Sequence, residues 1–468
     1  MMDLATAAAA TGGRVRGANV AFLRVSTDSR TLEPGDLFVA LAGERFDGHA
    51  FVAQARSRGA VAAMVATSRA AEVPGDVLVV DDPLAGLGRL AASWRARFTL
   101  PLVVVVGSNG KTTVKEMTAA ALRAHFDDGA VLATSGNLNN AIGLPLTLLR
   151  LRESHRAAVI ELGMNHRGET AELAPLAAPT IALVNNAQRE HQEFMRSVAE
   201  VADEHADAIR ALPAGGIAVI NADDPHAGVW RDAAARAGAR VVGFGTSAAA
   251  DVRAEIALRA DGSTLAIAAP QGRATVELAA PGRHMAHNAI GAAAAALAAG
   301  ASLEAVARGL RGFRPVAGRL AVARAALGAT VIDDSYNANP DSVRAAIDVL
   351  AAAPAPRWLV LGDMGEVGDA GPAYHREIGA YAREAGVERL FATGPLSRDA
   401  VAAFGPRGRH FDDAGALAAA LAGELAPGAT VLVKGSRFMR MERVVAALVG
   451  KAPTLAAHAA ALPPEGEQ

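Results

Sequence analysis

The segment Gly107-Ser108-Asn109-Gly110-Lys111-Thr112-Thr113 has the residue types of a loop that binds phosphate groups. It directly follows Leu102–Val106, a continuous apolar run that is typical of a parallel strand buried on both faces. Backbone N–H groups of such a loop form an anion site together with the N-terminus of a following helix, which we expect to begin near Thr112. In that arrangement Lys111 would neutralise the β- and γ-phosphates, and the Thr112 hydroxyl would ligate Mg²⁺.

The spacing of this loop differs from the usual G-x-x-x-x-G-K-T pattern. Val105 stands where the first glycine is expected, and Gly107 lies three residues before Gly110 instead. The alternative interpretation is a surface turn that contains Gly-Lys-Thr by chance. Because an apolar run precedes the loop and a helical pattern follows it, the sequence favours nucleotide binding.

Two further residues could complete a metal–nucleotide site. Glu161 follows the apolar run Ala157–Ile160, and His191 lies beyond a second run at Ile181–Asn185. Open α/β sheets bind ligands at the carboxyl ends of their strands, where both side chains are expected. Magnesium near phosphates needs such oxygen and nitrogen ligands. Taken alone, Glu161 could instead cap a helix or lie on the surface, and His191 could be a structural histidine.

An asparagine-rich loop at residues 134–143 precedes a predicted helix that has a proline in its first turn. Asn137, Asn139 and Asn140 can each donate and accept hydrogen bonds, which suits a polar, uncharged ligand. The alternative is an array of Asx turns. The sequence therefore leaves open whether these amides bind a ligand or shape the loop.

A second polar loop, Asp333–Ser342, follows a predicted strand and precedes a predicted helix in the last third of the chain. Asp341 or Ser342 could cap that helix, but the polar density exceeds what capping requires. Cations stand at nearby loop positions Arg319, Lys434 and Arg437. Surface charge is the alternative interpretation for each of the three cations.

The elements that must position these residues follow an alternating α/β pattern. Apolar runs predict strands at Leu37–Leu41, Ala62–Ala66, Val77–Val80, Leu102–Val106, Ala157–Leu162, Ile181–Asn185, Ile217–Ile220, Ala329–Asp333, Trp358–Leu361, Leu390–Thr393 and Thr430–Val433. Helical patterns lie between several of them, beginning with Phe51–Arg58. From about Leu102 onward this order predicts a doubly wound parallel sheet, and the pattern changes again near Phe313–Arg319. The Ala-, Pro- and Glu-rich tail from about Ala452 is expected to fray.

Composition narrows the class of protein. A length of 468 residues suggests about three domains. The formal charge of −2 argues against a broad nucleic-acid-binding or polybasic membrane surface. Cysteine is absent, which excludes disulfides, thiolate nucleophiles and Cys-ligated metals. Neither a targeting segment nor an apolar run long enough to span a bilayer is evident, so a cytoplasmic protein is expected.

Taken together, these segments resemble the Mur ligase superfamily over nearly the whole chain. The matching motifs are Ser26–Arg30, Gly43–His49, Gly107–Thr113, Gly136–Gly143, Glu161–His166, the region of His191, Asp333–Ser342, Leu361–Glu366 and Val433–Arg437. The resemblance implies a UDP-sugar-binding N-terminal domain (1–98), a central doubly wound P-loop ATPase domain (99–314) and a C-terminal Rossmann-like ligand-binding domain (315–468). It also implies ATP and Mg²⁺, and a monomer is expected because no association motif is evident.

The implied reaction is ATP-dependent ligation in peptidoglycan synthesis. The terminal carboxylate of UDP-MurNAc-tripeptide would form an acyl phosphate, which the amine of D-Ala-D-Ala would then attack. The form Asn337-Ala338-Asn339-Pro340-Asp341 favours this dipeptide-adding branch over the branch that adds diaminopimelate or lysine, which typically has Asp-Asn-Pro-Arg. Folylpolyglutamate synthase shares the ATPase layout but not the expected first domain. A non-catalytic P-loop switch is the alternative from another class, and the intact set of Lys111, Thr112 and Glu161 argues against it.

The resemblance assigns roles to individual residues. It implies Lys111, Glu161 and His191 as catalytic residues, and Thr112, Glu161 and His191 as metal ligands. ATP contacts are expected from Gly107, Ser108, Asn109, Gly110, Lys111, Thr112, Thr113, Asn288, Arg319 and Asp333. Substrate contacts are expected from Ser29, Arg30, Asn137, Asn139, Asn140, Asn337 and Asn339.

The sequence departs from the family at two places. Mur ligases commonly carry a lysine, modified to a carbamate that supports magnesium, where this chain has Glu204 or His205, and no lysine lies between Lys115 and Lys434. Either Glu204 supplies a carboxylate directly or His205 acts as a ligand, or both face solvent on a helix. The second departure is Met285, where the family's Gly-x-His-Asn-x-x-Asn pattern has asparagine. It weakens the assignment of Asn288 to adenine.

Overall fold

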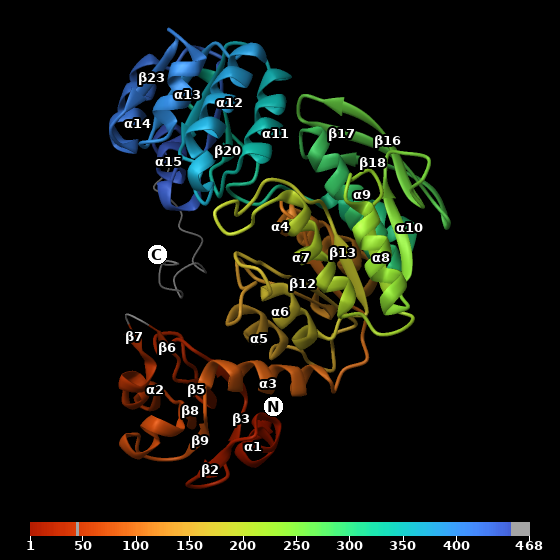
Figure 1. The fold of residues 1–468 in the computed structure, drawn as a ribbon, viewed down its shortest axis with the longest axis vertical. Coiled ribbons are helices and arrows are strands. Elements are labelled where there is room, and N and C mark those ends of the chain that lie inside the picture. The colour runs from red at the N-terminus through yellow and green to blue at the C-terminus, as the bar shows by residue number, and fades with distance from the viewer. Residues whose placement is uncertain (44–45, 451–468) are drawn as a thin grey trace.

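A computed structural model describes residues 1–43 and 46–450 and shows three α/β parts arranged along the long axis of the molecule (Figure 1). The N-terminal part lies at one end, the central part in the middle and the C-terminal part at the other end. Glu44-Arg45 of the first-domain motif and the tail from Ala452 lie outside the described residues. The domain boundaries after residues 98 and 314 stay predictions.

The N-terminal part is built on a five-stranded sheet with the order β2-β9-β8-β5-β4. Its strands are β2 (Arg14–Arg16), β4 (Arg24–Ser26), β5 (Asp36–Val39), β8 (Ala62–Ala66) and β9 (Val77–Val80), and its helices are α1 (Leu4–Thr11), α2 (Val52–Ser57) and α3 (Pro83–Arg95). Two short strand pairs accompany the sheet, β1 (Met2–Asp3) with β3 (Ala21–Phe22) and β6 (Ala42–Gly43) with β7 (Phe46–Asp47). Asp82 caps α3 by accepting hydrogen bonds from the N–H groups of Leu84 and Ala85, and this helix leads into the central part (Figure 1).

The central part contains a nine-stranded sheet with the order β11-β12-β10-β13-β14-β15-β16-β17-β18. The strands are β10 (Leu102–Val106), β11 (Val131–Ala133), β12 (Ala157–Glu161), β13 (Ile181–Val184), β14 (Ile217–Asn221), β15 (Arg240–Gly245), β16 (Val252–Arg259), β17 (Gly262–Ala269) and β18 (Gly272–Leu278). The helices are α4 (Lys111–Phe126), α5 (Gly143–Leu148), α6 (Glu169–Ala177), α7 (Val198–Arg210), α8 (Ala227–Ala237), α9 (Arg283–Ala298) and α10 (Leu303–Gly312). The chain order reverses beside β10, which makes its carboxyl end the ligand-binding crevice expected of such sheets.

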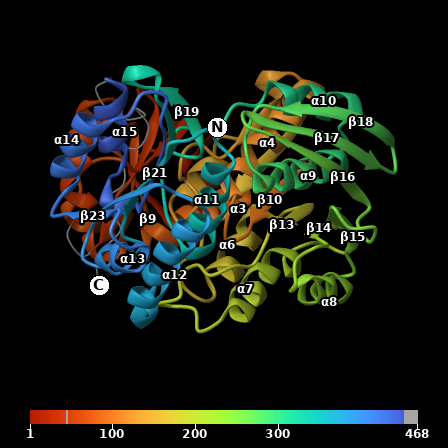
Figure 2. The same cartoon turned by 90° about the horizontal axis from the view of Figure 1, so that it is seen from above.

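The predicted strands of the central sheet pair in parallel as expected, and an antiparallel segment that the sequence did not predict follows them. Strands β11 to β16 pair in parallel, but β16, β17 and β18 form an antiparallel meander. Short loops join these three strands, and such loops can connect only antiparallel neighbours. Seen from above, the meander lies on the side of the molecule away from the N- and C-terminal parts (Figure 2).

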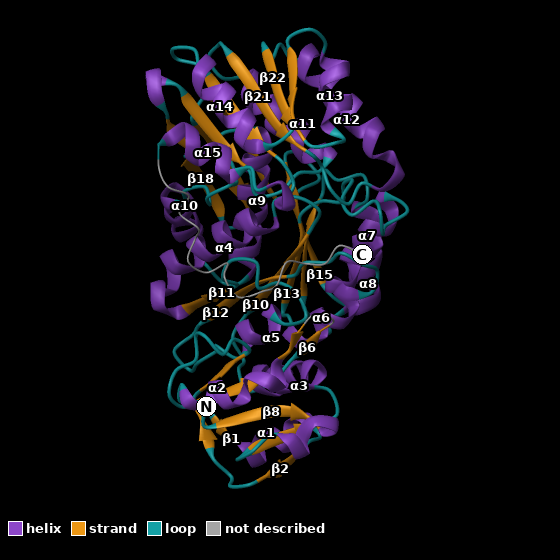
Figure 3. Cartoon of the chain, turned by 90° about the vertical axis from the view of Figure 1, so that its left-hand side faces the viewer, coloured by secondary structure: helices purple, strands orange, loops and turns teal. Residues whose placement is uncertain are grey.

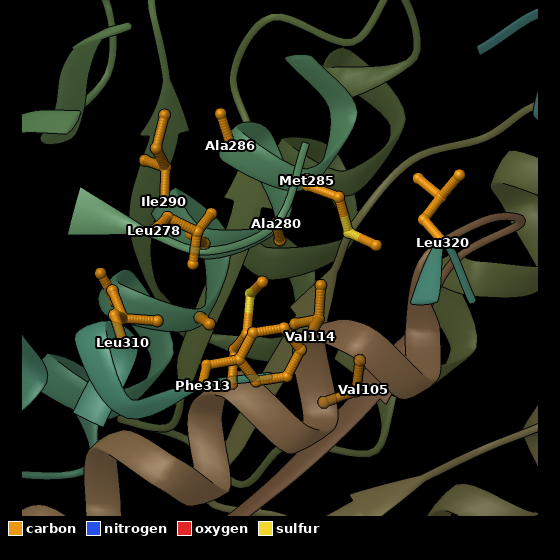
Figure 4. Packing of buried hydrophobic residues seen from close by; sticks show 14 of the residues in the cluster. Val105, Val114, Leu278, Ala280, Met285, Ala286, Ile290, Leu310, Phe313 and Leu320 are labelled. Atoms are coloured by element: carbon orange, nitrogen blue, oxygen red, sulfur yellow. The ribbon is translucent and has the colours of Figure 1, made fainter. Parts of the chain in front are cut away.

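The central strand β10 is buried on both faces, as its β-branched run predicts. Val103 and Val105 belong to one apolar cluster, whereas Leu102, Val104 and Val106 belong to the cluster on the opposite face. On the first face α4, α9 and α10 pack together, with Val105, Val114 and Phe313 facing one another (Figure 4). This two-sided packing fixes the end of β10 from which the phosphate loop starts.

The C-terminal part is a six-stranded sheet with the order β19-β20-β24-β21-β22-β23, antiparallel only at β19–β20. The strands are β19 (Ala321–Arg324), β20 (Thr330–Asp334), β21 (Arg357–Gly362), β22 (Arg389–Thr393), β23 (Gly408–Phe411) and β24 (Thr430–Lys434). The helices are α11 (Pro340–Ala351), α12 (Gly371–Glu384), α13 (Ser397–Phe404), α14 (Ala414–Glu424) and α15 (Glu442–Val449). Helices α11 to α13 cover one face and α14 with α15 the other (Figure 3). This three-layer arrangement confirms the predicted Rossmann-like fold.

None of the helices in residues 1–43 and 46–450 is long and apolar enough to cross a membrane. The Ala-rich stretch around residues 291–300 instead lies mainly in α9, whose residues 292–296 are fully buried in the core.

Candidate active site

The phosphate loop connects β10 to α4, and α4 begins at Lys111, one residue before the predicted start. Gly110 has a φ of +83°, and a Cβ there would lie 2.6 Å from Oδ1 of Asn288, so only glycine fits. The loop is braced by the segment after β13: the N–H of Asn109 donates to Oδ1 of Asn186 at 2.8 Å. The side chain of Lys111 folds over the loop and donates to the Gly107 carbonyl at 2.6 Å.

Glu161 is the last residue of β12 and lies next to this loop. One of its carboxylate oxygens accepts from the Thr112 hydroxyl at 2.8 Å, and the other accepts from Nδ2 of Asn139 at 2.8 Å. Its own N–H donates to the hydroxyl of Thr134 at 3.0 Å, and the carbonyl of Thr134 accepts from the buried Lys115 ammonium at 2.8 Å. Neighbours from α4 and the asparagine-rich loop thus hold the carboxylate in one orientation.

A second carboxylate, that of Glu190, pairs with Lys111. Its Oε2 is 3.3 Å from the Lys111 ammonium, and its Oε1 is 3.2 Å from Nε2 of His205. Burial raises the pKa of Glu190, but Lys111, His205 and His191 lower it by more, to about 2. Glu190 is therefore charged beside the loop at neutral pH.

His191 connects the central part to the C-terminal part. Its Nδ1 lies 2.7 Å from Oε2 of Glu366, and both residues have a positive φ, +48° and +57°. Burial lowers the pKa of His191, but the carboxylates of Glu366 and Glu190 raise it by more, so that the net pKa is raised. Strained backbone at two residues in contact across an interface is typical of a functional site.

The polar loop after β20 faces the phosphate loop. Nδ2 of Asn339 donates to Oδ1 of Asn109 at 2.9 Å. Lys434, at the end of β24, donates to Oδ2 of Asp334 at 2.6 Å and to the carbonyl of Asn337 at 2.9 Å. Burial raises the pKa of Asp334 despite Lys434 beside it. The guanidinium of Arg319 lies over the ring of Tyr336, 4.2 Å from its centre.

A cavity of about 690 Å³ lies between these two loops. The predicted site residues that line it are Ser108, Asn109, Gly110, Lys111, Thr112, Thr113, Asn137, Asn139, Asn140, Glu161, His191, Asn288, Arg319, Asn337 and Asn339. They come from both the central and the C-terminal parts, so the cavity is formed only when the two parts meet. Its lining of amides, cations and carboxylates suits a polar, charged ligand.

Four predicted site residues do not line this cavity. Ser29 donates to Oε1 of Gln54, and Arg30 pairs with Asp28, both in the N-terminal part. Asp333 does not line the cavity and accepts from the N–H groups of Gly318 and Ser335, while its neighbour Asp334 lines the wall. This alternation is that of a strand, whose successive side chains point to opposite faces. Gly107 contributes its carbonyl to Lys111 from just outside the cavity.

Some of the predicted asparagines shape the loops as well as lining the cavity. Asn140 accepts from the N–H groups of Ile142 and Gly143 at the start of α5, which is an Asx-type cap. Asn339, rather than Asp341, caps α11, and Ser342 completes the capping box. Met285, at the second departure from the family pattern, packs in the core (Figure 4) and also lines the cavity together with Asn288.

The two residues that replace the family's lysine are both buried, so the alternative that they face solvent is wrong. The carboxylate of Glu204 accepts from the N–H groups of Gly168 and Thr170, both at 2.8 Å, at the N-terminus of α6. It does not line the cavity. His205 lies against Glu190 instead. Glu204 is therefore placed to stabilise α6 rather than to hold magnesium.

Replacing Glu204 by alanine should lower stability without changing the magnesium requirement. The variant leaves the N–H groups of Gly168 and Thr170 at the start of α6 without their acceptor, which destabilises the fold by about 1–3 kcal/mol. Denaturant unfolding and the magnesium dependence of turnover measure the two effects separately. A shifted magnesium dependence would restore the view that Glu204 binds the metal.

Arg189 links the central part to two helices of the C-terminal part. Its guanidinium donates to Oδ1 of Asp341 at 2.6 Å and to Oε2 of Glu377 at 2.8 Å, on α11 and α12. Its backbone N–H also donates to Oδ2 of Asp341 at 2.8 Å. This side chain thus fixes where the C-terminal loops lie over the phosphate loop.

Arg189→Ala is expected to reduce kcat/KM about tenfold or more, because misplacing catalytic groups by about 1 Å can reduce rates about a hundredfold. Arg344→Ala is the matched control, since Arg344 contacts Glu377 from within the C-terminal part. Steady-state kinetics and small-angle scattering would show a slower and more open Arg189 variant. Equal behaviour of the two variants would contradict this role.

The donors at the cavity fit a magnesium ion that arrives with a nucleotide. Within the described ranges, no group of three or more His, Cys, Asp or Glu side chains could hold a metal ion. Magnesium at nucleotide sites is usually held by one or two carboxylates together with phosphate oxygens and waters. The Thr112 hydroxyl and the Glu161 carboxylate are such oxygen donors, and both line the cavity.

The sequence does not predict Glu190, Arg189 or Glu366 as site residues. For Glu190 and Arg189 a signal was present, because they follow the predicted strand Ile181–Asn185 at its carboxyl end. Glu366 is brought to the site only by the contact between the central and C-terminal parts.

The phosphate loop lies where the strand order of the central sheet reverses, and a second α/β part covers it. This arrangement defines the class of nucleotide-dependent α/β proteins. Family models match most of the chain: the Mur ligase family catalytic domain at residues 22–95, the Mur ligase middle domain at 105–296 and the Mur ligase glutamate ligase domain at 318–437. The chain belongs to the Mur ligase family.

Relatives and solved structures agree with this assignment. The UDP-N-acetylmuramoyl-tripeptide–D-alanyl-D-alanine ligase of Escherichia coli K12 is 43% identical over 441 residues, covering 93% of this chain and 96% of the relative. A crystal structure of MurF from Acinetobacter baumannii superposes with a TM-score of 0.87 at 33% identity, covering 96% of this chain and 99% of the other. The MurF ligase of Thermotoga maritima, solved in complex with ADP, has a TM-score of 0.78 at 26% identity, with coverage of 92% and 97%.

Proposed function

We propose that this chain is an ATP-dependent ligase that joins D-Ala-D-Ala to UDP-MurNAc-tripeptide and so makes UDP-MurNAc-pentapeptide for peptidoglycan synthesis. The observation that carries the proposal is the cavity in which the phosphate loop faces the polar loop after β20. A nucleotide bound to the phosphate loop would lie beside the substrate groups that the polar loop after β20 holds. The named activity of the Escherichia coli relative, which matches 93% of this chain, supports the same substrates.

The proposed reaction has two steps. The terminal carboxylate of the tripeptide attacks the γ-phosphorus of ATP, forming an acyl phosphate as ADP leaves. The amine of D-Ala-D-Ala then attacks the carbonyl carbon, and phosphate leaves from the tetrahedral intermediate while the amine loses a proton. The γ-phosphoryl group is thereby transferred to a carboxylate instead of to water.

The first step brings two negatively charged groups together, and side chains of the cavity would reduce the repulsion between them. A carboxylate that approaches a triphosphate is repelled, and Lys111 with the N–H groups of its loop would offset this repulsion. Magnesium, when bound, supplies further positive charge at the phosphates. Thr112 and Glu161 would hold it, with His191 assisting. Asn288 and Arg319, which line the same cavity, would contact the nucleotide.

The closed arrangement of the two parts would protect the acyl phosphate from water. Two contacts hold the C-terminal loops over the phosphate loop: the hydrogen bond between Asn339 and Asn109, and the ion pair between Arg189 and Asp341. Excluding water from a reactive intermediate is a known reason for such closure. In this proposal residues 1–98 bind the UDP-sugar through Ser29 and Arg30, residues 99–314 bind ATP, and residues 315–468 help to bind the incoming dipeptide. We further propose that the protein acts as a monomer in the cytoplasm, where ATP is available.

The proposal is tested by phosphate release from Mg-ATP and UDP-MurNAc-tripeptide, with and without D-Ala-D-Ala. We expect release that depends on the dipeptide, together with a product of the mass of UDP-MurNAc-pentapeptide. Turnover with diaminopimelate or lysine on the muramoyl-dipeptide would instead indicate another Mur-type ligase. Nucleotide binding without turnover on any acceptor would favour the P-loop switch.

A further inference from the structure

Glu190 is a buried carboxylate in the wall of the cavity that the reaction described above does not use. It is 5% exposed, and it lines the cavity beside Lys111 and His191. Its Oε2 lies 3.3 Å from the Lys111 ammonium and 3.7 Å from Nε2 of His191. Among the described residues its Oε1 has no well-aligned hydrogen-bond partner. A carboxylate buried in this way is costly unless cations or donors compensate its charge.

His205 supports this carboxylate from behind. It lies on α7, is 1% exposed and does not line the cavity. Its Nε2 is 3.2 Å from Oε1 of Glu190, the oxygen on the other side of the carboxylate from Lys111. Helix α7 is itself fixed, because the indole N–H of the buried Trp230 donates to the carbonyl of Ala202 at 2.9 Å. His205 can therefore orient Glu190 but has no direct access to a ligand in the cavity.

We propose that Glu190, positioned by His205, supplies the negative charge that a carbamylated lysine supplies in the family, and so supports both Lys111 and the divalent cation of the nucleotide. This inference rests on the proposed function. The position aligned with the modified lysine is occupied by Glu204 or His205, and the contacts of these two residues differ. Glu204 is bound to the N-terminus of α6, whereas His205 faces a carboxylate that reaches the cavity.

The proposal has a chemical consequence, because a carbamate forms only when a lysine amine takes up carbon dioxide. The buried lysines near the site are already engaged, Lys115 with the carbonyl of Thr134 and Lys434 with Asp334. A glutamate is a permanent carboxylate and needs no modification. Binding of metal and nucleotide by this chain should thus be independent of carbon dioxide.

The test measures binding of Mn²⁺ in the presence of ADP, by the electron paramagnetic resonance signal of free Mn²⁺, on the full-length chain. Glu190→Gln keeps the size of the side chain and removes its charge, and we expect Mn²⁺ affinity to fall roughly ten- to hundredfold. Glu190→Asp, which keeps the charge, should lose less. Glu200→Gln is the control, because Glu200 pairs with Arg196, does not line the cavity and should bind as the unmodified chain does. Thermal unfolding of each variant reports folding separately.

His205 is tested as a positioning residue. His205→Ala should weaken Mn²⁺ binding by about tenfold, and His205→Gln, which keeps a donor near Glu190, should recover part of it. For the unmodified chain, buffers free of carbon dioxide should leave Mn²⁺ binding unchanged, and ¹³C-labelled bicarbonate should produce no carbamate signal in NMR spectra. Wild-type-like binding by Glu190→Gln, or binding that requires bicarbonate, would overturn the proposal.

The outcomes also separate this inference from the proposed function. If the unmodified chain binds Mn²⁺ with ADP and Glu190→Gln does not, the role of Glu190 stands even if no dipeptide-dependent phosphate release is found. If the chain is an active ligase and Glu190→Gln binds Mn²⁺ as the control does, only the inference fails.

Discussion

Lys111→Ala is expected to reduce ligase turnover by at least about a thousandfold. Its ammonium stands at the phosphate loop, 2.6 Å from the Gly107 carbonyl, with no other lysine of the described ranges in contact with the loop. Stabilising the charge that develops on a transferring phosphoryl group contributes about a hundredfold to a hundred-thousandfold in rate. A loss of this size in kcat, with a smaller change in the KM for ATP, would place the effect in the transition state.

The matched control for this variant is Arg123→Ala. Arg123 lies on the same helix, α4, at the end away from the loop, where it pairs with Asp128. Phosphate release should be unchanged in the control, and circular dichroism should show both variants folded. Turnover of Lys111→Ala within tenfold of the unmodified chain would contradict a role of Lys111 in phosphoryl transfer.

Glu161→Gln is expected to raise the Mg²⁺ concentration that gives half-maximal turnover, and to reduce the maximal rate about a hundredfold. The substitution removes the charge beside Thr112, so the cation is held less tightly. It also introduces an amide N–H₂ group at the carboxylate that now accepts hydrogen bonds from the Asn139 amide and the Thr112 hydroxyl. Both effects weaken the same site.

A magnesium titration of turnover and of ADP binding measures this prediction. Glu200→Gln is again the control, because its carboxylate pairs with Arg196 outside the cavity. A Glu161 variant with the magnesium dependence of the control would show that the metal is held elsewhere, and the assignment of Thr112 and Glu161 would then be wrong.

Local sequence was sufficient to predict the elements around the phosphate loop. The run at 102–106, the glycines and the helix after them form β10, the loop and α4 because each depends on nearby residues. Glu161 and His191 were predicted from the rule that strand ends of a parallel sheet meet at one edge. Both line the cavity, and the fold class and the family are confirmed.

The remaining parts of the site depend on contacts that no local pattern contains. Asn288 lies on α9, far along the chain from Asn185, from whose amide it accepts a hydrogen bond, and it was predicted only through the family resemblance. Glu366 and Arg189 acquire partners only when the C-terminal part closes on the central part. Asp333 was predicted through the same resemblance, and it is its neighbour on β20, Asp334, that lines the cavity. The domain boundaries and the roles of single residues stay predictions.

The most direct test of the account follows oxygen atoms through the reaction. UDP-MurNAc-tripeptide would be prepared with ¹⁸O in its terminal carboxylate and converted with Mg-ATP and D-Ala-D-Ala. If the carboxylate attacks ATP and phosphate then leaves, each released phosphate carries one ¹⁸O atom, and the pentapeptide product retains the other in its new amide. Phosphate without ¹⁸O would contradict the account, because the γ-phosphoryl group would then have been transferred to water.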